Sequence, residues 1–79
     1  MVISALVLTL SLDPVVRAHA LDALGADPRL TLGALVETRL PVVAEAASTA
    51  DGASLCDQLS AHLGVERVDV IAIDFLEDS

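Results

Sequence analysis

The chain has 79 residues, 54% of them apolar, and its 12 carboxylates against four basic side chains give a net charge of −8. This length suits one small domain, residues 1–79, and so apolar a composition excludes intrinsic disorder. Nucleic acid is not expected as a partner, because phosphate binding needs a basic face and base stacking needs more than a single aromatic ring. A basic partner is the natural complement of such a surface.

The first predicted element is a buried strand, Val2–Leu10, which is almost wholly apolar. This run is too short to cross a bilayer as a helix, and a secretory signal would need a basic residue ahead of it, whereas the first one is Arg17. A lone cysteine, Cys56, fits a reducing compartment. We therefore expect a cytoplasmic protein with no membrane insertion.

The next predicted element is a helix that begins at Asp13-Pro14, because Asp is a good N-cap and proline a good first helical residue. Gly25 marks its end. A second helix is expected to start at the cap Asp51 and to end at Gly64. The remaining predicted elements are strands at Leu30–Glu37, Leu40–Ala47 and Val68–Phe75, followed by a short acidic tail, Leu76–Ser79.

This order of elements predicts an α+β fold of the ferredoxin-like, split βαβ type (βαββαβ). Two helices would cover one face of a four-stranded antiparallel sheet, with the first and third strands in the centre. Pro41 cannot donate a hydrogen bond within a sheet, so it should lie among the first residues of its strand or at a bulge.

Strict alternation assigns Leu6, Leu8 and Leu10 to the side covered by the helices and leaves the other side exposed. An antiparallel sheet with a solvated face should be polar there, so an apolar face predicts an interaction site. These features alone support a partner peptide and self-association equally. The candidate binding residues on this face are Ile3, Ala5, Val7, Thr9, Val43, Glu45, Asp69, Ile71 and Ile73.

No pattern in the sequence predicts catalysis, a metal site or a cofactor. His19 and His62 lie on different predicted helices without a neighbouring ligand at metal-binding spacing, so each is expected to be solvated or to cap a helix. Cys56 adjoins an apolar helical stripe and is expected to act as a small buried hydrophobe. Glu45 and Asp69 have no nucleophile or basic site beside them, so we expect no enzyme.

Three segments carry a resemblance to a known family: Arg39–Glu45 (RLPVVAE), Gly64-Val65 leading into Val68–Ile73 (VDVIAI), and Ile3–Leu8 (ISALVL). In these segments the chain resembles the NapD family, small cytoplasmic assembly chaperones of periplasmic nitrate reductase. It implies a ferredoxin-like domain that binds the twin-arginine signal peptide of the catalytic subunit and holds back export until the molybdenum cofactor is in place.

On this hypothesis, the apolar candidates would contact the apolar segment of the signal peptide, and Glu45 and Asp69 would receive its arginines. The protein would be a monomer or a weak homodimer. The alternative is a regulatory domain similar to the ACT family, which would bind a small molecule and dimerise through its sheet.

Overall fold

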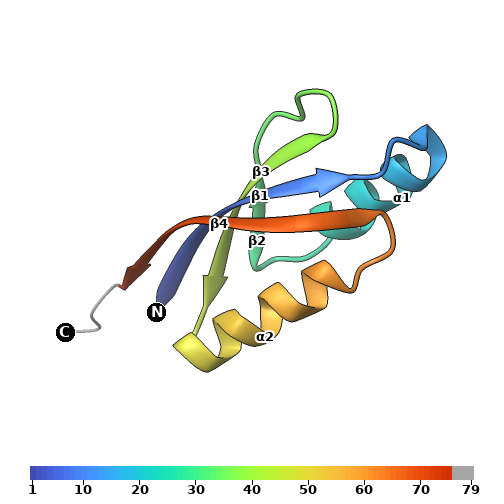
Figure 1. Cartoon of the computed structure of the whole chain (residues 1–79). Coiled ribbons are helices and arrows are strands. Elements are labelled where there is room, and N and C mark those ends of the chain that lie inside the picture. The colour runs from blue at the N-terminus through green and yellow to red at the C-terminus, as the bar shows by residue number, and fades with distance from the viewer. Residues whose placement is uncertain (76–79) are drawn as a thin grey trace.

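The computed structural model describes residues 1–75, and the expected acidic tail lies outside them. Within that range the strands pair antiparallel in the order β2-β3-β1-β4. This arrangement confirms the α+β, ferredoxin-like fold and the central position of the first and third strands (Figure 1). The elements are β1 Val2–Leu10, α1 Pro14–Gly25, β2 Leu30–Leu32, β3 Arg39–Ala46, α2 Thr49–Ser60 and β4 Val65–Phe75.

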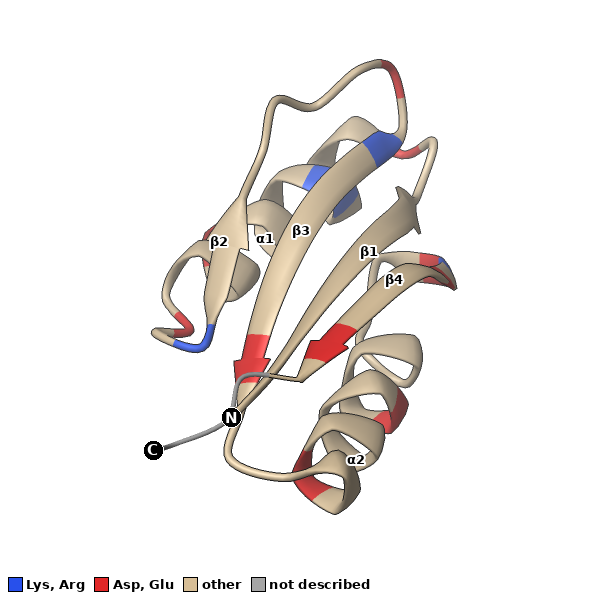
Figure 2. Cartoon of the chain, turned by 90° about the vertical axis from the view of Figure 1, so that its left-hand side faces the viewer, with Lys and Arg blue, Asp and Glu red and all other residues tan. Residues whose placement is uncertain are grey.

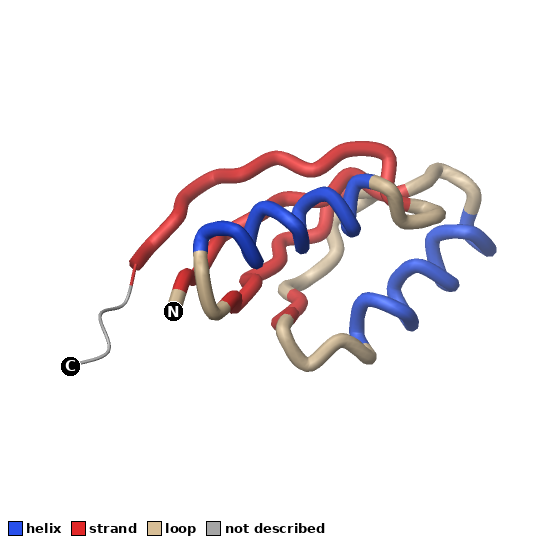
Figure 3. The backbone as a smooth tube through the Cα atoms, turned by 90° about the horizontal axis from the view of Figure 1, so that it is seen from below, coloured by secondary structure: helices blue, strands red, loops and turns tan. Residues whose placement is uncertain are grey.

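The sheet and the helices form two layers, with both helices on the same side of the sheet (Figures 1 and 3). Burial alternates strictly along β1, as expected for a strand with one covered face. Leu6, Leu8 and Leu10 are buried and pack against Leu24 of α1 and Leu55 of α2 in one apolar core. The helices therefore cover the side of β1 that alternation predicted.

The start of α1 is confirmed, and that of α2 differs from the prediction. The Asp13 carboxylate accepts hydrogen bonds from the backbone N–H groups of Val15 at 2.9 Å and Val16 at 3.3 Å, which caps α1. The cap of α2 is Ser48, whose Oγ accepts a bond from the N–H of Asp51 at 3.2 Å. Asp51 instead lies in the first turn, where its negative charge interacts favourably with the positive end of the helix dipole.

The end of α2 also differs, because the helix stops at Ser60 and not at Gly64. Leu63 consequently lies outside the helix and is 77% exposed. Gly64 has a φ of +91°, and a Cβ there would lie 2.9 Å from the Cβ of Ala20. Glycine is thus required at the point where the turn after α2 passes against α1.

The second strand is shorter than predicted. β2 ends at Leu32, and the chain then forms a loop up to Arg39. The Gly33 N–H donates to the Pro41 carbonyl at 2.7 Å. The N–H and C=O of a residue in an antiparallel strand point toward the same neighbouring strand. The backbone nitrogen of Pro41, which carries no hydrogen, therefore points toward Gly33, just beyond the end of β2, and away from β1. Pro41, the third residue of β3, therefore breaks no hydrogen bond to β1.

Candidate functional site

The sheet side opposite the helices is uncovered within residues 1–75, and we call it the open face. Val43 is 41% exposed there and Ile71 is 65% exposed. A hollow of about 310 Å³, lined by Ala5, Val7, Val43 and Ile71 among others, indents its middle. The open face therefore has apolar side chains accessible from solvent over more than one strand, as the sequence predicted.

The register of the strands sorts the open face into four rows, because residues directly opposite each other in an antiparallel pair point to the same face. The two inner rows are apolar except for one carboxylate, and the outer rows carry charges of opposite sign. Figure 2 shows acidic residues in red at the ends of both β3 and β4, and a basic residue in blue at the start of β3. In order along β1 the rows are Glu45–Ile3–Asp74, Val43–Ala5–Ala72, Pro41–Val7–Asp69 and Arg39–Thr9–Arg67.

One predicted residue of this face, Ile73, is on the wrong side. A β-bulge at Ile71 shifts the pairing of β4 with β1, so that Ala5 pairs with Ala72 and the buried Ser4 pairs with Ile73. An extra residue in one strand reverses the side on which every later residue lies. Ile73 therefore lies on the helix side, whereas Ile71 stays on the open face.

The two predicted arginine receptors, Glu45 and Asp69, are not brought together. They lie in rows that are four residues apart on β1, a separation of about 13 Å along the strand. The Asp69 carboxylate already accepts a hydrogen bond from Nε of Arg67 at 3.0 Å. The carboxylate that shares a row with Glu45 is Asp74, with Ile3 between them.

Three charged residues that were not among the predicted candidates also belong to this face: Asp74, Arg39 and Arg67. Strict alternation from Asp69 places Asp74 on the helix side, and only the bulge returns it. Arg39 and Arg67 flank Thr9, a residue that was predicted to lie there. Alternation back along the strands from Pro41 and from Asp69 puts both arginines on the open face, and this is the signal that identifies them.

A groove of about 300 Å³ separates β4 from α2 on the helix side. Val70 and Ile73 line it from β4, and Ala53 and Cys56 line it from α2. Burial raises the pKa of the Cys56 thiol, and the neighbouring Asp57 carboxylate raises it further. The thiol is therefore protonated at neutral pH and a weak nucleophile.

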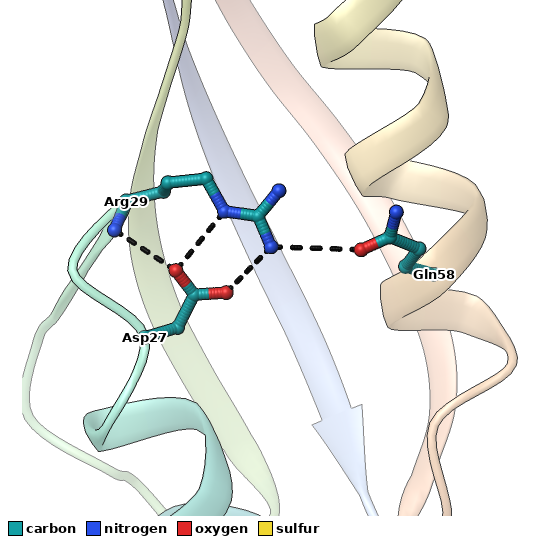
Figure 4. A network of polar contacts seen from close by, with 3 residues as sticks. All are labelled: Asp27, Arg29 and Gln58. Atoms are coloured by element: carbon teal, nitrogen blue, oxygen red, sulfur yellow. Dashed lines mark hydrogen bonds and ion pairs between the residues drawn. The ribbon is translucent and has the colours of Figure 1, made fainter.

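A more polar hollow, of about 540 Å³, lies where the loop before β2 approaches α2. Arg29 in this loop donates to both carboxylate oxygens of Asp27, at 3.0 and 2.7 Å, and approaches Gln58 of α2 at 3.5 Å (Figure 4). The Arg29 guanidinium lowers the pKa of Asp27 by hydrogen bonding. The bidentate bonds to Asp27 therefore hold the Arg29 side chain within its own loop, at the edge of this hollow.

The histidines differ in their contacts. His19 is exposed on α1, while Nδ1 of His62 lies 2.8 Å from the Leu63 carbonyl, just after α2. Among residues 1–75 no cluster of three or more His, Cys, Asp or Glu side chains could hold a metal ion. In the same part of the chain no helix has the length and apolar character needed to cross a membrane.

Comparisons with protein-family models, with curated proteins and with solved structures find no match to this chain.

Proposed function

We propose that the chain is a binding chaperone without catalytic activity. Its open face would bind the twin-arginine signal peptide of the catalytic subunit of periplasmic nitrate reductase in the cytoplasm. The observation that carries this proposal is an uncovered sheet face with an apolar middle and a row of two carboxylates at one end. A twin-arginine signal has the matching composition, paired arginines followed by an apolar segment.

Apolar contact would supply most of the affinity. Burying one large aliphatic side chain contributes roughly 1.5–3 kcal/mol, whereas an exposed ion pair contributes about 0.2–1 kcal/mol. Val43 and Ile71 retain a large exposed fraction that a partner could cover. The carboxylates would act mainly on the rate and geometry of association.

The identity of the peptide rests on the resemblance of Arg39–Glu45 and Val68–Ile73 to the NapD family. The acidic character of the chain, with a net charge of −8, supports a basic partner of this kind. Binding before export would keep the precursor in the cytoplasm until its cofactor is inserted.

The test is calorimetric titration of the protein with a nitrate reductase signal peptide and with an Arg-Arg→Lys-Lys version of it. Micromolar or tighter binding, about −8 kcal/mol or better, that weakens with the lysine version supports the proposal. No binding at any salt concentration refutes it. Sedimentation tests the alternative: the small-molecule regulatory domain would dimerise through the open face, so a monomer at high concentration counts against it.

A matched pair of variants locates the binding surface. Val43→Gln introduces a polar group on the open face, while Val15→Gln makes the same change at an exposed site on α1. Only Val43→Gln should weaken binding, and both variants should keep the circular dichroism spectrum of the parent. Equal binding by the two variants would place the peptide on another surface.

A further inference from the structure

We infer that the open face fixes the direction of the bound peptide, with its paired arginines over the row of Glu45 and Asp74 and its following residues running parallel to β1 toward Arg39 and Arg67. This inference rests on the proposed function. It assigns Asp74 a binding role and removes Asp69 from the site for the arginines.

The acidic end has the geometry to receive two guanidinium groups. Glu45 and Asp74 lie on the strands on either side of Ile3, so their backbones are about 10 Å apart, two strand spacings. Arginines at neighbouring positions of a peptide can each reach one of these carboxylates while their aliphatic stems pack on Ile3.

The opposite end of the face would repel the same arginines. Arg39 and Arg67 flank Thr9 in the last row. One oxygen of the Asp69 carboxylate is bonded to Nε of Arg67 at 3.0 Å, so Asp69 offsets only part of the positive charge of the two arginines. A peptide bound in the reverse direction would therefore place like charges together.

The dipole of a helical peptide favours the same direction. The N-terminus of a helix carries a partial positive charge and its C-terminus a partial negative charge. With the arginines over Glu45 and Asp74, the positive end meets the acidic row and the negative end meets Arg39. The outer rows are six residues apart on β1, about 20 Å, which corresponds to roughly 13 helical residues.

Paramagnetic NMR on the full chain tests the direction. The probe is a synthetic peptide of Arg-Arg and an apolar helical segment, with a nitroxide at its N-terminal or C-terminal end. The N-terminal label should broaden the amide signals of Ile3 and Glu45, and the C-terminal label those of Thr9 and Arg39. Tight binding with the reverse pattern, or with equal broadening of both rows, overturns the inference and leaves the proposed function intact. Absence of binding refutes the proposed function itself.

Charge-removing variants test the contact. Glu45→Gln combined with Asp74→Asn should weaken binding about 2- to 30-fold, the range for two exposed ion pairs. Asp22→Asn combined with Asp57→Asn removes the same charge from the exposed surfaces of α1 and α2 and should change the affinity less. Equal weakening by the two double variants would mean long-range attraction only and would overturn the placement of the arginines.

Discussion

Serine substitutions at Ile71 and Ile73 offer the most direct test of the open face. These isoleucines lie two residues apart on β4, and they are 65% and 52% exposed. The bulge nevertheless places them on opposite sides of the sheet. Complete burial of a large aliphatic side chain contributes roughly 1.5–3 kcal/mol. A peptide that covers the exposed two thirds of Ile71 would therefore gain about 1–2 kcal/mol of binding free energy. Ile71→Ser should therefore weaken signal-peptide binding about 5- to 30-fold, and Ile73→Ser should leave it within about twofold.

The assay is calorimetric titration of both variants, alongside denaturant unfolding to show that their stabilities are similar. A ligand-free check uses methyl NMR, in which Ile71 should show contacts to Val43, and Ile73 should show contacts to Ala53 across the α2 groove. If Ile73→Ser weakens binding as much as Ile71→Ser, the strand alternates without a bulge and the assignment of the open face is wrong.

Three further predictions concern the rest of the fold. Gly64→Ala should lower the free energy of unfolding by at least about 2 kcal/mol in urea titrations, because residue 64 has a φ of +91° and its Cβ would contact Ala20. Gly52→Ala, inside α2, should instead raise the free energy of unfolding by about 0.5–1 kcal/mol. Similar effects of the two substitutions would contradict the geometry. Cys56 should react with iodoacetamide at pH 7.5 more slowly in the folded chain than in urea, since burial raises its pKa, and equal rates would show that the thiol is not shielded. The lowered pKa of Asp27 means that its pairing with Arg29 stabilises the fold above the ordinary pKa of about 4 and that this contribution is lost as the pH falls through the folded-state value. Asp27→Asn should thus lower the free energy of unfolding slightly at pH 7, and by less as the pH falls below that ordinary value; a difference independent of pH would contradict the ion pair.

The sequence predicted those parts of the sheet in which alternation runs without interruption. β1 and β3 keep a period of two from end to end, so their covered and uncovered sides follow from the apolar residues alone. The same rule fails in β4 beyond Ile71, because a bulge adds one residue and reverses the later positions. Nothing in the local sequence around Ile71 marks that bulge, which depends on the pairing with β1. This is why Ile73 was placed on the wrong side and Asp74 was missed.

Two boundaries failed because sequence signals competed. The alternation of Leu30 and Leu32 continues at Ala34 and Val36, but pairing ends near Pro41, which has no N–H to donate to a longer β2. Ser48 and Asp51 are both good caps, and the folded chain uses the earlier one while the later one lies in the first turn. The end of β2 was therefore decided by a residue of the neighbouring strand, and the start of α2 by the choice between two suitable caps.

The two edges of the sheet differ in a way that limits uncontrolled association. On one edge, β2 is three residues long, its Leu30 N–H is bonded to the Asp27 carbonyl, and Pro41 next to it lacks a donor. The other edge is the 11-residue strand β4. Growth of a fibre by edge-to-edge stacking requires two receptive edges on each molecule, and short strands and prolines make an edge unreceptive. Association through strand pairing alone would therefore end at two copies, joined along their β4 edges.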